Sequence, residues 1–443
     1  MFKKTFTIGG IHPAPHKEAD PHPTLLELPR VAVLPLRQHI GAPAQPVVAK
    51  GDRVSRGQLV ADHPVFVSAG VHTPISGTVI AVGDAVMADG RTAPAITVSA
   101  SEQEHDSDSA ARRDYWEGLV PGQADRTLSE RTDAETIRRC IADSGIVGLG
   151  GATFPSHVKL QPGRRHPSLL IINGCECEPY LMCDDALMRT YPARVAEGVE
   201  IMMKGADIAR AVIAIEDNKP EAAQAMREAT AGNDAVSVVL LRTRYPQGGE
   251  KQLVQAVTGR RVPSGALPAD VGAVVHNVAT AFAVWQAVDG GVALTERIVT
   301  VSGDLPAAER RNYIVAVGTP LSQLPFTMPS EPRIILGGPM MGRTVLNMDA
   351  PVTKGTSGIT VLSGTHRPAV QACMRCGRCV QACPMGLEPY LLATYGRLHR
   401  WEDARSAAVA DCIECGSCSY TCPSGRPLLD FIRLAKQRTR KTT

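Results

Sequence analysis

Eight of the twelve cysteines lie in two copies of one motif near the C-terminus. Both copies read C-x₂-C-x₂-C-x₃-C-P, at residues 373–384 and 412–423. This spacing is typical of paired cubane 4Fe–4S clusters, in which the fourth cysteine of each run binds the other cluster. We therefore predict two ligand sets, each with three cysteines from one copy and one from the other. The sets are Cys373, Cys376, Cys379 and Cys422, and Cys412, Cys415, Cys418 and Cys383.

Zinc is the alternative metal, since Cys₄ zinc sites also begin with C-x₂-C pairs. A zinc site needs only four thiolates. It gives no reason for three closely spaced cysteines and a fourth before proline, repeated twice. The spacing therefore favours iron–sulfur clusters over zinc and indicates a chain that transfers electrons.

Composition limits the remaining classes of protein. The 443 residues are enough for about three domains, and a net charge of +3 is too small to indicate nucleic-acid binding. Clustered cysteines favour metal ligation in a reducing cytosol over disulfides. The first ten residues contain no apolar segment of a signal peptide. The most apolar long stretch, residues 269–288, is interrupted by polar residues and does not predict a membrane-spanning helix. We expect membrane association only through a partner.

Residues 31–98 contain short β-branched runs separated by Gly and Pro, which predicts an all-β module. Within it, residues 50–60 and 73–79 resemble the barrel-sandwich hybrid of biotinyl and lipoyl domains. Those domains carry a cofactor on a lysine at a hairpin tip, but no lysine occurs between Gly57 and Pro74. We therefore expect a structural module. The polar residues 99–111 are predicted to form a linker.

From about Thr132 onward, helix and strand patterns alternate, which predicts a mostly parallel α/β sheet. Ligands of such sheets bind beyond the carboxyl ends of the strands. The loops at those ends are residues 173–185, 216–219 and 242–249. The strands are predicted at residues 169–172, 211–215 and 236–241, and the helices at 133–143, 193–205, 220–230 and 250–257.

Two further regions follow the α/β region. Short strands predicted at residues 297–301, 313–317 and 333–336 indicate a small α+β module. Between the cysteine motifs, apolar residues recur at helical spacing from Leu387 to Trp401. This pattern predicts a helical cluster domain without a β-hairpin lid.

A glycine-rich loop lies at residues 144–159. Glycines at positions 148, 150 and 151 allow backbone N–H groups to approach a phosphate, and Lys159 can supply a countercharge. The segment lacks G-x-G-x-x-G directly after a strand, so it is not a Rossmann fingerprint. A glycine loop by itself is more often a tight turn.

Three more segments support a nucleotide site. Residues 173–180 place two carboxylates and an amide after a buried strand, where they can accept hydrogen bonds from ribose hydroxyls. Residues 245–250 form a second glycine turn directly before a helix. Asn277 and Thr280 are polar residues in an apolar segment, and each alone is better interpreted as a helix cap. The combination of four such sites upstream of two redox clusters favours nucleotide binding.

These segments resemble the flavin- and NADH-binding domain of the flavin-bearing subunit of respiratory complex I. With Gly9-Gly-Ile-His-Pro and Cys183-Asp-Asp, they resemble more closely the RnfC subunit of the Rnf (Rsx) ion-translocating electron-transport complex. The resemblance covers nearly the whole chain in order and implies a multidomain α/β protein. The implied parts are residues 1–100 (N-terminal arm and β barrel-sandwich hybrid), 130–292 (FMN/NADH-binding α/β domain), 296–348 (soluble-ligand-binding β-grasp module) and 365–433 (helical two-cluster ferredoxin domain).

The resemblance also implies non-covalent FMN, with NADH as substrate. The flavin then carries the chemistry, and no catalytic side chain is predicted. Nicotinamide and ribose contacts are implied for Phe154, Glu178 and Glu250. Positions implied for FMN are Gly148, Gly150, Gly151, Lys159, Asn173, Glu176, Tyr245, Gly248, Gly249, Asn277 and Thr280.

Two other groups of residues are predicted not to bind metal. Cys140, Cys175, Cys177 and Cys183 lack the spacing of a cluster motif, and we interpret them as core thiols. His12, His16 and His22 lie in a proline-rich segment that is typical of an extended arm.

The implied function is that of a peripheral NADH-dependent oxidoreductase subunit of an ion translocase. It would couple electron transfer between NAD(H) and a low-potential partner to ion translocation. Its partners would be the membrane-embedded and iron–sulfur subunits at the cytoplasmic face of the bacterial inner membrane. The alternatives are a soluble cobalamin-reductase-type flavo-iron–sulfur protein, in which the hybrid motif follows the clusters, and a non-enzymatic ferredoxin-type relay.

Overall fold

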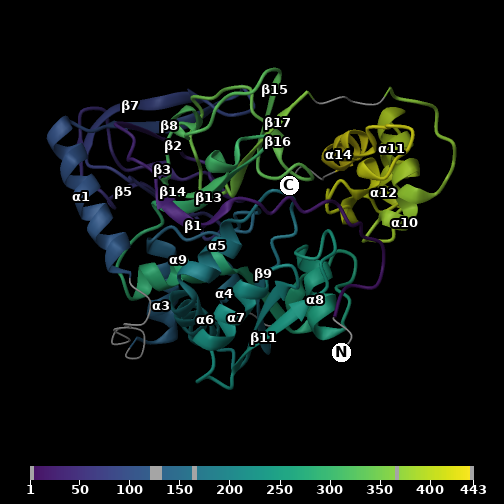
Figure 1. The fold of residues 1–443 in the computed structure, drawn as a ribbon, viewed down its shortest axis with the longest axis horizontal. Helices are drawn as coiled ribbons and strands as arrows, with labels where there is room; N and C mark the ends of the chain where they lie inside the picture. The colour runs from purple at the N-terminus through teal and green to yellow at the C-terminus, as the bar shows by residue number, and fades with distance from the viewer. Residues whose placement is uncertain (1–3, 120–131, 162–166, 365–368, 440–443) are drawn as a thin grey trace.

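The computed structural model describes residues 4–119, 132–161, 167–364 and 369–439. Figure 1 shows a β-rich region above an α/β region, with a helical C-terminal region beside them. The described strands form one six-stranded, two four-stranded and one three-stranded sheet.

The N-terminal region contains two small antiparallel sheets that share one apolar core. Successive side chains of a strand point to opposite faces, so Leu34, Val79 and Ile96 are fully buried between the sheets. The all-β prediction is confirmed. In spatial order the first sheet consists of β2 (Val31–Pro35), β8 (Thr92–Ser99), β7 (Gly77–Val86) and β4 (Arg53–Val54), and the second of β3 (Gln45–Pro46), β5 (Leu59–Asp62) and β6 (Val71–His72).

The segment predicted to be a linker is largely helical. Residues Glu102–Gly118 form α1, so the linker prediction for residues 99–111 is wrong. Ser101 caps this helix by a reciprocal pair of hydrogen bonds with Glu104. Hydrophobic periodicity does not reveal the helix because its buried face is mostly polar. That face consists of His105, Asp108, Arg112 and Trp116.

The α/β region is built on a four-stranded parallel sheet in the order β11-β10-β9-β12. Its strands are mainly apolar because helices cover both faces. The predicted alternation is confirmed. The fourth strand was not predicted, since its apolar run continues directly into a helix. The strands are β9 (Leu169–Gly174), β10 (Ala211–Glu216), β11 (Val236–Leu241) and β12 (Ala273–Asn277), and the helices are α3 (Ala134–Asp143), α4 (Ser156–Leu160), α5 (Cys183–Thr190), α6 (Pro192–Ala206), α7 (Pro220–Ala229), α8 (Glu250–Thr258) and α9 (Val278–Val288).

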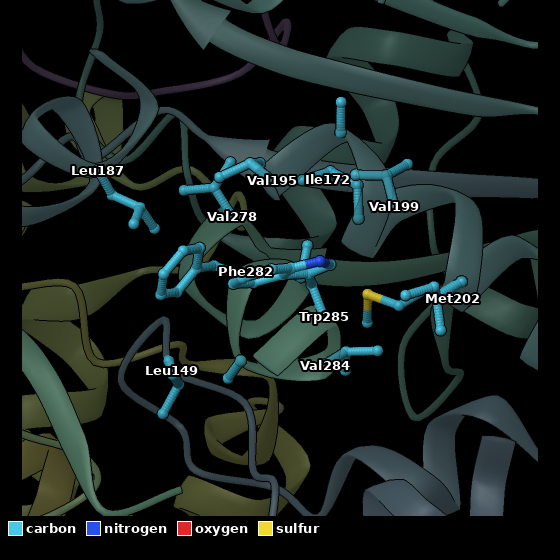
Figure 2. Packing of buried hydrophobic residues seen from close by; sticks show 14 of the residues in the cluster. Leu149, Ile172, Leu187, Val195, Val199, Met202, Val278, Phe282, Val284 and Trp285 are labelled. Carbon is cyan, nitrogen blue, oxygen red and sulfur yellow. The ribbon is translucent and has the colours of Figure 1, made fainter. Parts of the chain in front are cut away.

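The largest apolar core lies where α6 and α9 cover one face of this sheet. Figure 2 shows Phe282 and Trp285 of α9 packed among apolar side chains of α6 and the sheet. The two rings lie 5.7 Å apart between centroids. Leu149, from the glycine-rich loop, belongs to the same core. The loop is therefore anchored to the sheet by packing.

The six-stranded sheet joins segments that are far apart in sequence. Its strands confirm those predicted at residues 297–301, 313–317 and 333–336, with shifted ends. Two more strands, at residues 20–25 and 358–363, lie outside the predicted module boundaries of 296–348. Parallel pairing of distant segments leaves no local turn signal in the sequence. In spatial order the strands are β1 (Asp20–Leu25), β14 (Arg311–Ala316), β13 (Glu296–Gly303), β17 (Gly358–Ser363), β15 (Pro332–Leu336) and β16 (Arg343–Thr344).

The C-terminal region is helical, and its apolar core includes Leu392, Val409 and Ile432. The helical prediction between the two cysteine motifs is confirmed. None of the helices in the described ranges has the length and apolar content needed to cross a bilayer. The helices are α10 (Arg378–Ala382), α11 (Pro389–Arg397), α12 (Trp401–Ser406), α13 (Ser417–Tyr420) and α14 (Leu428–Thr439).

A buried ion-pair network joins α1, the N-terminal sheets and the six-stranded sheet. The side chain of Glu296, 7% exposed, accepts hydrogen bonds from Arg112 at 2.8 Å, from Arg56 at 3.2 Å and from the Trp116 indole. We predict that Glu296→Leu lowers the free energy of unfolding by about 3–5 kcal/mol, because it leaves buried arginine charge unpaired. Urea unfolding followed by tryptophan fluorescence measures this change.

The matched control is Glu102→Leu. Glu102 pairs with Arg30 at 3.8 Å, but its side chain is 80% exposed, so screening leaves the pair with little effect on stability. Equal destabilisation by both substitutions would contradict the role given to the Glu296 network.

Candidate functional site

The predicted nucleotide residues converge at the carboxyl edge of the parallel sheet. Asn173 at the end of β9 donates a hydrogen bond to the carbonyl of Gly248 at 2.9 Å, in the loop after β11. Asn277 at the end of β12 donates to the carbonyl of Asn173 at 3.3 Å. Parallel pairing aligns these strand ends, so residues more than 100 positions apart meet.

The glycine-rich loop folds over the start of α9. The Gly148 N–H donates to the Phe154 carbonyl at 2.8 Å, which closes the loop, and the Leu149 N–H donates to Thr280 Oγ1 at 2.9 Å. The N–H groups of Gly150 and Gly151 donate to no acceptor in the described part of the chain. Gly151 has a φ of 106° and open space on its Cβ side. The loop thus presents free backbone donors, as a phosphate site requires.

Asn277 and Thr280 have more than a capping role. Asn277 does cap α9, since its side chain accepts from the Ala279 N–H at 2.8 Å, so the cap interpretation is confirmed for this residue. Its amide also donates to Asp184 Oδ2 at 2.6 Å. Thr280 is fully buried, and its hydroxyl holds the glycine-rich loop.

Lys159 and Glu250 form an ion pair at the same edge of the sheet. The Lys159 ammonium donates to Glu250 Oε1 at 2.7 Å and to the Val275 carbonyl at 3.1 Å. The lysine side chain is 31% exposed and the glutamate side chain 42%. The pair places a cation at the ligand edge beside an acceptor.

The carboxylate loop, residues 175–181, follows β9 and is held by two lysines that the sequence analysis missed, the buried Lys219 and the half-buried Lys17. Lys219, after β10, donates to the carbonyl of Cys175 at 2.6 Å, and Lys17 donates to the carbonyls of Glu176 and Glu178, both at 2.8 Å. Glu176 also accepts from the first backbone N–H groups of α5, a favourable place for negative charge. Lys219 lies in a predicted ligand-edge loop, and Lys17 follows the Gly-Gly-Ile-His-Pro motif. Both signals were present in the sequence without an assigned role.

Burial changes the protonation of the acids at this edge. It raises the pKa of Glu178 to about 7, against the opposing effect of the Met340 N–H, which donates to this carboxylate at 3.1 Å. Burial, with the negative charge of Glu176, raises the pKa of Asp184 to about 7. Burial opposes charge on Lys219, but Glu216 and Glu176 outweigh it and raise the pKa of Lys219. The site therefore combines protonatable carboxyls with a fixed cation.

The motif cysteines are arranged across the two copies. We define the near set as Cys383, Cys412, Cys415 and Cys418, whose side chains line one cavity in the helical region. We define the far set as Cys373, Cys376, Cys379 and Cys422. In this set, burial raises the pKa of Cys379, and Cys422 of the other copy is close enough to add to this effect. Cys373 and Cys376 are exposed.

The sulfur spacing argues against single zinc ions. A tetrahedral zinc site with Zn–S bonds of about 2.3 Å places its sulfurs about 3.8 Å apart. All eight motif cysteines are described, yet no three of their sulfurs lie within 4.8 Å of one another. Among described residues, only Glu176, Cys183 and Asp184 form such a group, and hydrogen bonds satisfy both carboxylates. The near-set thiols instead line one cavity, as a multi-iron cluster needs.

A buried contact joins the near set to the sheet edge. The Tyr245 hydroxyl donates to the carbonyl of Cys415 at 2.8 Å, and Tyr245 is 2% exposed. Gln252 of α8 donates to the Pro384 carbonyl at 3.3 Å. Cys177 of the carboxylate loop packs against the apolar cluster of Tyr245 and Cys415. The two candidate redox sites are therefore direct neighbours.

The family comparisons agree with this architecture. Residues 4–103 match the RnfC barrel-sandwich hybrid domain, residues 141–286 match the Nuo51 FMN-binding domain, and residues 372–426 match the 4Fe–4S dicluster domain. A solved NAD⁺-reducing [NiFe]-hydrogenase in the H₂-reduced state has the same fold over 73% of this chain and 66% of its own, with a TM-score of 0.51 and 18% identity.

Three curated relatives, each the C subunit of its complex, match over most of their length. The chain is 42% identical to that of the proton-translocating ferredoxin:NAD(+) oxidoreductase complex of Clostridium ljungdahlii, over 90% of this chain and 86% of that protein. It is 44% identical to that of the ion-translocating oxidoreductase complex of Rhodobacter capsulatus, over 88% and 75%. It is 40% identical to that of the Na(+)-translocating ferredoxin:NAD(+) oxidoreductase complex of Acetobacterium woodii, over 97% and 96%.

Fold and site together define an electron-transfer protein with an FMN-binding domain and a 4Fe–4S dicluster domain. The N-terminal barrel-sandwich hybrid precedes both. The chain belongs to the RnfC family, whose members are subunits of the Rnf ion-translocating oxidoreductase complexes, so the resemblance found in the sequence is confirmed.

The raised pKa of Glu178 predicts a pH-dependent stability. Between its ordinary value of 4.5 and about 7, the folded chain keeps this proton while the unfolded chain releases it. The carboxyl therefore contributes stability below pH 4.5 that is lost as the pH rises through 7. We predict that Glu178→Gln reduces the fall in melting temperature between pH 4.5 and 7, measured by calorimetry.

Exposed Glu221, at the start of α7, provides the control for this measurement. Glu221→Gln should leave the pH profile of the melting temperature as in the parent chain. An unchanged profile in Glu178→Gln would show that the buried carboxyl does not titrate in this range.

Proposed function

We propose that this chain transfers electrons between NAD(H) and the membrane-bound part of an ion-translocating complex. Two of its relatives are named for electron transfer between ferredoxin and NAD⁺ coupled to proton or sodium translocation. The observation that carries the proposal is the Tyr245 hydrogen bond to Cys415, because it joins the carboxyl edge of the parallel sheet to the near set.

We assign FMN to the carboxyl edge of the parallel sheet. The free N–H groups of Gly150 and Gly151 fit a phosphate, and Lys159 lies at the same edge as its countercharge. When bound, FMN would take two electrons from NADH as hydride and release them one at a time, as one-electron clusters require. The other proposed FMN contacts are Gly148, Asn173, Glu176, Tyr245, Gly248, Gly249, Asn277 and Thr280.

The carboxylates and Phe154 have a separate proposed role, toward NADH. The Glu250 side chain is 42% exposed at this edge, where a carboxylate can accept hydrogen bonds from a ribose. Glu178 is buried and can be protonated near neutral pH, so it can donate or accept a hydrogen bond beside the nicotinamide. Phe154 closes the glycine-rich loop and is proposed to contact the nicotinamide ring.

Each cysteine set is proposed to hold one 4Fe–4S cluster, and the resulting order of carriers follows from burial. The near set is mostly buried and contacts the sheet edge, whereas the far set includes the exposed Cys373 and Cys376. Electrons would therefore pass between the sheet edge and a partner by way of the near set and then the far set.

The partners proposed for the chain are the membrane-embedded and iron–sulfur subunits of the complex, at the cytoplasmic face of the bacterial inner membrane. The domain order supports this assignment over a cobalamin-reductase-type protein, since the hybrid domain precedes the flavin domain here. We also propose the boundaries of four parts of the chain. They are the arm and barrel-sandwich hybrid at residues 1–100, the FMN/NADH-binding domain at 130–292, the β-grasp module at 296–348 and the two-cluster domain at 365–433.

The direct test is an NADH-to-dye reductase assay on anaerobically purified protein, with flavin, iron and sulfide counted. We expect one FMN, about eight iron atoms per chain and NADH oxidation. Protein with both clusters but no FMN binding and no NADH oxidation would leave only the relay function.

Lys159→Gln tests the flavin assignment. Loss of a charged donor should weaken FMN binding by about tenfold or more, since a charge-assisted hydrogen bond contributes about 1.5–3 kcal/mol. Titration of the apoprotein with FMN, followed by flavin fluorescence, measures the affinity. The control is Lys50→Gln, an exposed lysine in the turn between β3 and β4. An equal affinity for FMN in the two variants would exclude Lys159 as an FMN contact.

Cys418→Ser tests the ligand sets. We expect iron to fall from about eight to about four atoms per chain, with loss of the near-cluster signal in electron paramagnetic resonance (EPR). Cys140→Ser changes a thiol outside the motifs, which donates to the Ala287 carbonyl, and should keep full iron. Full iron in Cys418→Ser would exclude the assigned set.

A further inference from the structure

The N-terminal arm, defined here as residues 9–17, runs between the α/β region and the cluster region. Figure 1 shows it as the purple trace that passes beside the helical C-terminal region before reaching β1. It pairs with the loop after β11, where Ile11 and Tyr245 exchange two backbone hydrogen bonds of 2.9 Å. The arm thus contacts the same Tyr245 whose hydroxyl reaches the near set.

One end of the arm lies against the near set. The Gly10 N–H donates to the Ala382 carbonyl at 2.9 Å. Gly9 approaches Cys383 so closely that a Cβ there would lie 2.3 Å from the Cys383 carbonyl oxygen, and its φ of 65° also favours glycine. The position of this cysteine therefore depends on a residue without a side chain.

The other end of the arm holds the carboxylate loop. The Lys17 side chain is 14% exposed. Its ammonium donates to the carbonyls of Glu176, Glu178 and Leu181, and it lies 4.0 Å from the Glu176 carboxylate. The Tyr180 N–H donates to the Pro15 carbonyl at 3.0 Å. A buried ammonium is costly unless it is fully hydrogen-bonded, so this contact indicates a specific holding role.

The carboxylate loop needs such a support. Glu176 and Tyr180 have positive φ values of 45° and 70°, a backbone conformation that costs energy in residues other than glycine. Such residues persist where surrounding contacts determine the backbone. The three carbonyls that bind Lys17 span both strained residues, so this one ammonium fixes the loop along its length.

The segment between the two ends is stiff. Residues 11–16 contain Pro13 and Pro15, each of which fixes its own φ and restricts the residue before it. A displacement at one end is therefore transmitted to the other, because few backbone angles remain to absorb it.

We propose that the N-terminal arm is a positioning element that fixes the near set relative to the carboxylate loop, with Gly9 and Lys17 as its positioning residues. The expected effect of the arm on the rate of electron transfer rests on the proposed function. Its expected effect on the geometry of the near set does not.

The first experiment uses Gly9→Ala in the full chain. Dithionite reduction followed by EPR should show altered g values and a shifted midpoint potential for the near cluster, with the far cluster unchanged. Stopped-flow mixing with NADH should show flavin reduction at the parent rate and cluster reduction slowed about tenfold. The matched control is His12→Ala, an exposed residue of the same arm. A near-cluster signal identical to that of the parent would overturn the proposal.

The second experiment addresses Gly9→Ala protein that loses its clusters. In the double variant Pro13→Gly, Pro15→Gly, the end contacts remain and only the stiffness is lost. We expect both clusters to be retained and transfer from flavin to cluster to slow. Parent-like transfer would overturn the proposal. A parent chain that NADH does not reduce would instead overturn the proposed function, while the dithionite comparison would still decide the role of Gly9.

Discussion

The parallel register of β9 with its two neighbours is the constraint on which the site depends. Because β10 and β12 both run alongside β9 in the same direction, the loops after all of these strands open at one edge. Asn173 and Asn277 are paired residues in this register, and their side chains organise the glycine turn after β11 and the cap of α9. A shift of one residue would turn these amides into the covered faces of the sheet.

A second constraint is the cost of buried charge. Two lysines and several carboxylates share the edge with little solvent, so each must find partners within the protein. Lys219 meets Glu216 at 3.6 Å, and Lys17 binds three carbonyls. These interactions orient the carboxylate loop, and the remaining desolvation raises the pKa of Glu178 and Asp184 into the neutral range. Charge and loop conformation therefore depend on each other.

Much of this could be predicted from the sequence, because the motifs carry their own chemistry. Cysteine spacing and the glycine-rich loop are local patterns, and the strands β9, β10 and β11 are long apolar runs with clear ends. The predictions failed where contacts are remote. The buried face of α1 is polar and is stabilised by Glu296, nearly two hundred residues away. The strand β12 merges with α9, and β1 and β17 complete a sheet through pairing that no local signal announces.

By itself, the sequence determined the chemistry of this protein: thiols at cluster spacing, a glycine-rich loop and carboxylates after a strand, since these depend on residue type and on distances of a few positions. Only the tertiary structure decided how those parts meet. It brought Cys415 to Tyr245, paired the arm with Tyr245, and placed the Lys17 ammonium against the carbonyls of the carboxylate loop. The physical reason is that burial and hydrogen bonding across long sequence separations arise from packing of whole domains, which local patterns do not encode.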